Sequence, residues 1–320
     1  MTGSLARVSV VIPCYNSARW IRETLASVMQ QGEDPIEIIA IDDGSTDDTA
    51  AIIERDFPAV RLVRTPNRGA SRARNHGTEL ASGEFIQYLD ADDLLIPGKL
   101  GIQLKAMEQT GADAAYGDWQ KLVLDENGGF VEGEITAKQM GRLAEIDLFT
   151  DFWCPPATYL FRRSIVEKVG GWNESLPVIQ DARFALDCAL HGGKFTYCSG
   201  VMAYYRVHSA ESLSRRDSVA FVRDIFRNAC EVEEWWRANG GLGAARTKAL
   251  TECYGYVARS TYERDPEIFE TAYTALMRLA PRYIPKGPPH LALAARFLGY
   301  RRAEAVALFY RRAKRSLPTR

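Results

Sequence analysis

The chain has no apolar run that approaches the roughly 20 residues a membrane-spanning helix needs. Only four histidines occur, and no two have the spacing of metal ligands. The six cysteines are scattered without a C-x-x-C pair, which argues against a zinc cage and a disulfide framework. No G-x-G-x-x-G follows a predicted strand, so a nicotinamide dehydrogenase is poorly supported. The formal net charge of −1 gives no indication of nucleic-acid binding.

The start of the chain and its cysteines predict a location. Residues 1–7 lead straight into the first predicted strand and leave no room for a secretory signal. Scattered cysteines are typical of free thiols in a reducing compartment. With 46% hydrophobic and 25% charged residues, the composition is that of a folded, soluble protein. We therefore expect a cytoplasmic protein with a sizeable core.

Strand-like and helix-like patterns alternate through the first hundred residues. Buried strands are expected at residues 8–13 and 36–41, a third short strand at 60–63, and a fourth at SGEFIQYL, which reaches Asp90. Helices between strands imply right-handed crossovers and a parallel sheet. Such sheets bind ligands at the carboxyl ends of their strands, where Tyr15 and the acidic residues of this region converge.

Later segments are less regular. A hairpin with its turn at residues 126–129 is expected, then helices at 163–169 and 180–191 and strands within 194–205. From about residue 218 onward, apolar residues recur with helical period and predict a helical C-terminal region.

Three carboxylates, Asp90, Asp92 and Asp93, follow the apolar end of the fourth strand in YLDADDLL. In an extended segment Asp90 and Asp92 point the same way, and they repel each other unless a cation lies between them. Mg²⁺ or Mn²⁺ would suit their oxygen ligands. The alternative is that Asp92 or Asp93 caps a helix starting near Leu94.

A second acidic pair, Asp42 and Asp43, ends the second strand. A carboxylate there could accept a hydrogen bond from the imide N–H of a nucleobase, or it could have a capping or loop role. Between the two acidic groups, NRGASRARN offers arginines suited to a diphosphate. Arg74 is the one we single out, with solvated surface as the alternative.

Five motifs occur in a recognisable order: VSVVIPCYN, IIAIDDGSTDDT, PNRGASRARNHG, ASGEFIQYLDADDLLIPGKL and GGWNESLPVIQD. Together, over about residues 6–212, they resemble family 2 glycosyltransferases, which are inverting enzymes of the GT-A fold that use nucleotide-diphosphate sugars. The resemblance implies an α/β fold with a Rossmann-like, mostly parallel sheet flanked by helices. Residues 1–98 would form the nucleotide-sugar-binding half, residues 99–215 the acceptor-binding half, and residues 216–320 the helical region.

The resemblance also implies roles for the donor-side residues. Pro13 and Tyr15 would border the nucleobase, and Asp42 would hydrogen-bond its edge. Asp90 would touch the ribose or the metal, and Asp92 would be the main ligand of the Mn²⁺ or Mg²⁺ on the diphosphate.

Asp181 matches the family's catalytic base, with Asp187 as a rival. The family usually has Glu immediately before the base, whereas this chain has Gln180. His208 is predicted to join the metal shell or to cap a strand. Trp172 is predicted either to stack on an acceptor sugar or to lie in the core.

The implied function is an inverting glycosyltransferase that moves a sugar, from a UDP-sugar by family habit, to a glycan or polyprenyl-linked glycan by metal-assisted single displacement. A sugar nucleotidyltransferase is an alternative, but it would show a glycine-rich phosphate loop with a lysine where this chain reads PCYNSARW. A nucleotide-sugar-binding protein without turnover is a second alternative, raised by Gln180.

The end of the chain has an amphipathic pattern. One stripe, opposed by arginines, consists of Ala303, Val306, Tyr310, Ala313 and Leu317, with Phe309 beside it. Such a helix could lie on the inner face of a membrane, which would make the protein peripheral, or it could pack its stripe on the protein.

Overall fold

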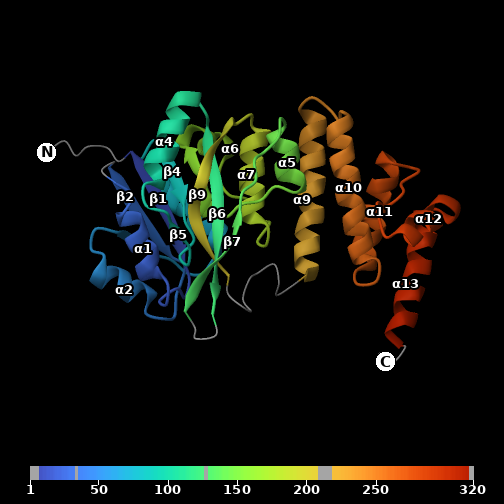
Figure 1. Cartoon of the computed structure of the whole chain (residues 1–320), viewed down its shortest axis with the longest axis horizontal. Helices are drawn as coiled ribbons and strands as arrows, with labels where there is room; N and C mark the ends of the chain where they lie inside the picture. Colours follow the sequence, from blue (N-terminus) through green and yellow to red (C-terminus); the bar gives the residue numbers. More distant parts are fainter. Residues whose placement is uncertain (1–6, 33–34, 126–128, 208–217, 317–320) are drawn as a thin grey trace. The chain divides into compact units, whose positions relative to one another are not determined.

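The computed structural model describes residues 7–32, 35–125, 129–207 and 218–316 (Figure 1). Its contacts divide the chain into two compact units, residues 1–212 and residues 213–320. We refer to them as the α/β unit and the helical unit.

One half of the sheet in the α/β unit is parallel. β1 (Val8–Cys14) lies between β2 (Ile36–Asp42) and β4 (Phe85–Tyr88), and β3 (Arg61–Arg64) extends the sheet beyond β2. All of these pairs are parallel, as predicted. β4 ends at Tyr88, two residues before the predicted Asp90, so the acidic cluster belongs to the loop that follows it.

The other half of the sheet is mixed. β8 (Leu160–Arg162) is antiparallel to both β4 and β6 (Ala114–Leu124). β6 is parallel to the long β9 (Phe195–Val207). β7 (Phe130–Thr136) completes the predicted hairpin with β6, and the short β5 (Leu94–Leu95) is antiparallel to β9. The parallel arrangement therefore holds for the first four strands and for β6 with β9.

Helices flank the sheet (Figure 1). They are α1 (Ile21–Met29), α2 (Thr49–Asp56), α3 (Ala70–Leu80), α4 (Lys99–Thr110), α5 (Ala144–Thr150), α6 (Arg163–Val169) and α7 (Gln180–Leu190). In β2, Ala40 packs into the main core, whereas Ile39 and Ile41 pack with Ala73 of α3. Burial on both faces explains why the first strands read as continuous apolar runs.

The helical unit contains α9 (Ser218–Ala238), α10 (Ala244–Thr261), α11 (Pro266–Leu279), α12 (Pro289–Leu298) and α13 (Tyr300–Ser316). At the start of α11, the Asp265 side chain accepts a hydrogen bond from the Ile268 N–H at 3.3 Å. Within the described residues, every helix is too short or too polar to cross a membrane.

The residues predicted to form one apolar stripe on the last helix do not share one environment, so this prediction is wrong. In α13, Ala303 is buried, whereas Val306 and Tyr310 are exposed. The side chains of Ala313 and Leu317 lie outside the described residues. Helical period alone identified the helix but not the side that packs against α12.

The contact between α3 and β1 gives a test of the fold. A Cβ on Gly77 would lie 2.3 Å from Cγ1 of Val11, so we expect Gly77→Ala to destabilise the protein by about 1–3 kcal/mol. Gly101 in α4 is the matched control, because a Cβ there meets no atom within 4 Å. Gly101→Ala should be neutral or stabilising by up to about 1 kcal/mol. Urea denaturation of both variants measures the difference, and equal midpoints would contradict this packing.

Candidate functional site

The loops that follow β1 and β2 meet at the carboxyl edge of the parallel strands. In the register of the sheet, Cys14 of β1 lies beside Asp42 of β2. The loops after these strands are tied together, because Asn16 Oδ1 accepts a hydrogen bond from the Thr46 N–H at 2.8 Å. Tyr15 remains 53% exposed on this rim, where its ring is available for stacking.

The two acids that end β2 have different partners. Asp43 is buried, and its carboxylate accepts hydrogen bonds from the backbone N–H groups of Arg68 at 2.9 Å and Gly69 at 2.8 Å. It therefore shapes the loop before α3. Asp42 is also buried, and its Oδ1 accepts a hydrogen bond from the Ser45 N–H at 3.2 Å. Pro13 is half-buried and pairs with Ile41, next to Asp42.

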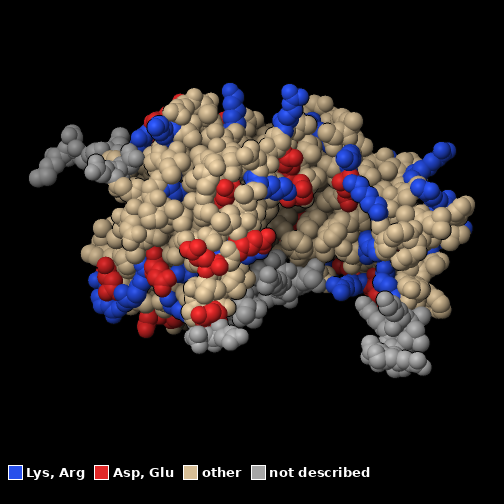
Figure 2. All heavy atoms as spheres, in the orientation of Figure 1, with Lys and Arg blue, Asp and Glu red and all other residues tan. Residues whose placement is uncertain are grey.

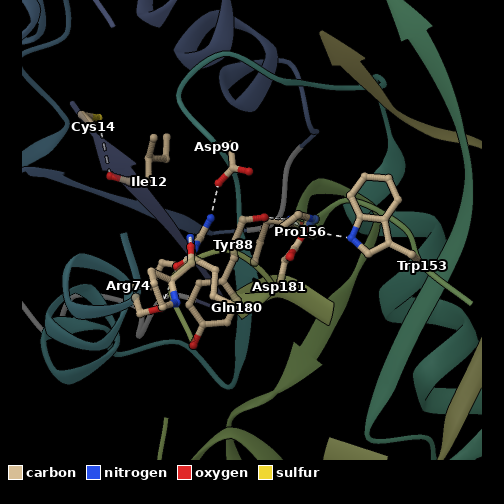
Figure 3. A network of polar contacts seen from close by, with 12 residues as sticks. Ile12, Cys14, Arg74, Tyr88, Asp90, Trp153, Pro156, Gln180 and Asp181 are labelled. Atoms are coloured by element: carbon tan, nitrogen blue, oxygen red, sulfur yellow. Dashed lines mark hydrogen bonds and ion pairs between the residues drawn. The ribbon is translucent and has the colours of Figure 1, made fainter. Parts of the chain in front are cut away.

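Arg74 contacts both the loop after β4 and the start of α7. Its side chain is 4% exposed and forms an ion pair with Asp90. It also donates a hydrogen bond to Gln180 Oε1 at 3.1 Å (Figure 3). Ser71 donates a second hydrogen bond to the same oxygen at 2.6 Å. Gln180 therefore holds Arg74 in place, and Arg74 is a buried partner of the acidic cluster, not solvated surface.

The Arg74 guanidinium lies 4.3 Å from the centre of the Trp172 ring. Trp172 is 4% exposed and stacks on Phe184 with ring centres 4.3 Å apart. The prediction that Trp172 stacks on a sugar is therefore wrong, and the core alternative holds. The Trp172 ring therefore packs against the Arg74 guanidinium and helps to fix its position.

The loop of the acidic cluster is fixed from β9. Asp93 is 1% exposed, and its Oδ1 accepts a hydrogen bond from the Arg206 N–H at 3.0 Å. Residues 94 and 95 form β5, so the alternative that Asp92 or Asp93 caps a helix near Leu94 is wrong. The Arg206 side chain donates to the Asp92 carbonyl oxygen at 2.7 Å and pairs with Glu23. Sequence reasoning missed these contacts because they join distant parts of the chain.

Two carboxyl groups of this cluster, those of Asp90 and Asp93, have raised pKa values. Burial raises the pKa of Asp90, and Asp92 raises it further while Arg74 opposes the shift. Burial, Asp92 and Asp90 raise the pKa of Asp93 well above its ordinary value. Burial and the surrounding carboxylates also raise the pKa of the Tyr205 phenol. Because neighbouring carboxylates contribute to each shift after burial, a cation bound among them would be stabilised.

The donor set fits a divalent metal with few protein ligands. One Asp93 carboxylate oxygen is buried without a hydrogen-bond partner, and Asp92 is half-buried at the mouth of the loop. Among the described residues, no group of three or more His, Cys, Asp or Glu side chains forms a ready-made metal cage. Mg²⁺ is commonly held by one or two carboxylates together with substrate phosphates, which agrees with this arrangement. His208 lies outside the described residues.

Asp181 lies in the first turn of α7 and is half-buried. Its Oδ2 accepts a hydrogen bond from the Trp153 indole N–H at 2.8 Å (Figure 3). The rival Asp187 forms an ion pair with Arg183 at 2.8 Å in the same helix. Asp187 therefore has a structural partner one turn away, and Asp181 is the better candidate base.

An aromatic wall stands beside Asp181. Trp119, Trp153 and Tyr205 pack edge to face, with ring centres 5.5 to 5.7 Å apart. Sequence reasoning noted the segment WCPPATYLF but missed Trp119 and Tyr205. The available signal was the two-residue period of each strand, which predicts the side chains that share a face with Trp119 in β6 and with Tyr205 in β9.

The sequence of residues 9–170 matches the model of glycosyl transferase family 2. The chain belongs to this family. An uncharacterized glycosyltransferase of Nostoc sp. is 32% identical over 216 residues, covering 64% of this chain and 66% of that relative. The Escherichia coli enzyme WfgD, a UDP-Glc:alpha-D-GlcNAc-diphosphoundecaprenol beta-1,3-glucosyltransferase, is 31% identical over 134 residues, covering 41% of this chain and 51% of WfgD. The chain also matches uncharacterized glycosyltransferases of three Rickettsia species, but it spans only 18% to 21% of the length of these relatives.

Two solved structures share the fold of this family member. TarS 1–349 of S. aureus, in complex with UDP-GlcNAc, aligns with a TM-score of 0.68 at 19% identity and covers 96% of this chain and 92% of that one. The mannosyltransferase PcManGT of Pyrobaculum calidifontis, in complex with GDP-Man and Mn²⁺, aligns with a TM-score of 0.56 at 21% identity, covering 97% and 88%. The α/β fold is thus that of GT-A glycosyltransferases.

The Trp153–Asp181 contact predicts a catalytic effect. Trp153→Phe keeps an aromatic ring but removes the N–H that orients the carboxylate. We expect kcat to fall about 10- to 100-fold, the cost of a hydrogen bond to a charged group. Trp119→Phe is the matched control, because Trp119 belongs to the same cluster. Steady-state release of nucleoside diphosphate measures both variants, and an equal loss in both would assign the effect to packing.

Proposed function

We propose that this family member is an inverting glycosyltransferase in which Asp181 is the base and the Asp90–Asp93 loop holds the donor diphosphate through a divalent metal. The carrying observation is that Arg74 links the two groups: it forms an ion pair with Asp90 and donates a hydrogen bond to Gln180, the residue immediately before Asp181 (Figure 3). The charge of Asp181 raises the pKa of Asp90, and the charges of Asp90, Asp92, Asp93 and Asp181 all raise the pKa of Tyr205. A leaving diphosphate and an attacking hydroxyl need this proximity.

On the donor side, Tyr15 and Pro13 would border the nucleobase, and Asp42 would accept a hydrogen bond from its edge. Asp92 would be the main metal ligand, with Asp90 on the metal or the ribose and His208 as a further ligand. When bound, Mn²⁺ or Mg²⁺ would stabilise the negative charge of the departing nucleoside diphosphate. Arg74 would keep Asp90 oriented without neutralising Asp92.

On the acceptor side, an Asp181 oxygen would take the proton of the attacking hydroxyl. A positioned carboxylate contributes roughly 10²–10⁴-fold to such a step. The Trp153 N–H would occupy the other oxygen, so only one carboxylate oxygen faces the acceptor. The aromatic wall would exclude water from the proton transfer.

Single displacement predicts inversion at the anomeric carbon, because the acceptor oxygen attacks opposite the leaving diphosphate. We expect an α-linked nucleotide donor to give a β-linked product. Proton NMR of the product's anomeric coupling measures this, and an α-linked product would contradict the mechanism.

The substrates proposed are a UDP-sugar and a glycan or polyprenyl-linked glycan. The UDP-GlcNAc complex of TarS supports a uridine donor, although the GDP-Man complex of PcManGT keeps guanosine in the test. WfgD, by its name, acts on a diphosphoundecaprenol-linked sugar. An acceptor of that kind would place the protein at the cytoplasmic face of a membrane.

The two alternatives have less support. Family membership speaks against a sugar nucleotidyltransferase. A binding protein without turnover was raised by Gln180, but the Gln180 side-chain oxygen contacts Ser71 and Arg74, and Asp181 keeps its own contact with Trp153. Gln180 therefore does not stand in for the base or displace it.

Ligand-dependent thermal stability tests the donor site. UDP, GDP and dTDP are compared with and without Mn²⁺, because binding to the folded state raises stability by RT ln(1 + [L]/Kd). We expect a metal-dependent shift with UDP that is abolished in Asp92→Asn. Asp48→Asn, at an exposed acid in the loop before α2, is the matched control and should behave as the native protein. The absence of a shift with any nucleotide would contradict the metal–diphosphate site.

A further inference from the structure

The hairpin formed by α12 and α13 has an unusual distribution of apolar side chains. Its buried seam consists mainly of small residues, namely Leu291, Ala295, Ala303 and Ala307. Several larger apolar side chains are instead exposed, and we call five of them the hairpin patch: Leu293, Phe297, Val306, Phe309 and Tyr310. Phe297 is 81% exposed and Phe309 is 76% exposed. A hairpin adapted only to water would place its phenylalanines in the seam, so this surface indicates a partner.

The members of the hairpin patch follow helical spacing. Leu293 and Phe297 are four residues apart in α12, on one face of that helix. In α13, Val306 is followed by Phe309 and Tyr310 at three and four residues, again on one face. The His290 and Tyr310 rings lie 5.7 Å apart, which places the end of the α13 stripe against the start of α12.

Basic side chains accompany the hairpin patch. Residues 289–320 contain eight lysines and arginines and a single acid, Glu304, in a chain whose net charge is −1. Glu304 is fully buried, so it adds no negative charge to the surface. Arg296 precedes Phe297, and Arg302 lies four residues before Val306; both are exposed. Figure 2 shows basic side chains on the helical unit bordering uncharged surface.

We propose that this hairpin is an interfacial anchor for an anionic lipid bilayer. The hairpin patch enters the boundary between headgroups and acyl chains, and Arg296 and Arg302 contact lipid phosphates. Large apolar groups flanked by arginines, with no exposed acid among them, match the chemistry of that boundary. The proposal deepens the membrane-linked acceptor of the proposed function and rests on it for its purpose. Lipid binding itself needs neither donor nor acceptor, so the two can fail separately.

Vesicle co-sedimentation of the full chain tests the anchor. Vesicles of phosphatidylcholine alone are compared with vesicles that also contain the anionic lipid phosphatidylglycerol. We expect binding to the anionic vesicles that weakens as salt is raised, because screening acts on exposed charges. Equal binding to both compositions, or no binding to either, would overturn the proposal.

Variants separate the two components. Phe297→Ser with Phe309→Ser should reduce partitioning at least about tenfold, because two large apolar side chains no longer leave water. Arg296→Gln and Arg302→Gln should each reduce it about fivefold. Ile102→Ser in α4 is the control, since Ile102 is equally an exposed apolar residue at 51% but lies in the α/β unit.

The same variants decide whether a second copy of the chain covers the hairpin patch instead. Light scattering without lipid should give the same molar mass for the native chain and for the Phe297→Ser, Phe309→Ser double variant. A dimer of the native chain that this double change dissociates is not expected. Such a dimer, or vesicle binding unchanged by the double change, would overturn the proposal. Nucleotide-dependent thermal shifts should be native in the double variant, which confirms that it is folded.

Discussion

The site depends on how the protein compensates three carboxylates within four residues. Asp90, Asp92 and Asp93 would repel one another at the end of a buried strand, and burial increases the cost. Two buried arginines from distant elements supply the compensation. Arg74 of α3 pairs with Asp90, and Arg206 of β9 donates from its backbone N–H to the Asp93 carboxylate and from its side chain to the Asp92 carbonyl oxygen. Thr24 of α1 adds a hydrogen bond to the Ala91 carbonyl oxygen at 3.0 Å. The loop is thus fixed from three sides, while Asp92 stays at its mouth.

This constraint connects the two sides of the reaction. The arginine that orients Asp90 is itself held by Gln180, the residue immediately before Asp181. Any movement at the start of α7 therefore changes the position of Arg74 as well as that of Asp181. Trp172 and Phe184 stack beneath this contact, so the core of the α/β unit supports donor-side and acceptor-side groups together.

Local pattern predicted the parts of the structure that depend on local chemistry. The first four strands and the acidic loop at their edge follow from apolar runs and the residues that end them. The role of Asp93 could not be predicted, because the same sequence fits a helix that begins at Leu94 and a strand that pairs with β9. Its true partner, the Arg206 N–H, is 113 residues away. Strand pairing at that separation depends on tertiary packing, which no periodicity in one segment records.

The aromatic wall and the hairpin patch show the same limit. Helical and strand periods identify which residues share a face, but not what that face meets. The residues predicted as one apolar stripe of α13 are partly buried and partly exposed. Trp172, one of whose two predicted roles was to stack on a sugar, packs on Phe184 in the core. Asp181 could be placed from its motif, whereas its contact with Trp153 required the fold.

Gln180 has a consequence for the charge of the donor pocket. A neutral amide leaves the whole positive charge of Arg74 to Asp90, whereas a glutamate in its place would share that charge between two acids. The proposed diphosphate site would therefore have one negative charge fewer than in family members with the glutamate–aspartate pair. Such a site would repel an anionic donor less and attract a cation less. If the proposed donor site is correct, Gln180 would therefore weaken the binding of a metal relative to that of the nucleotide.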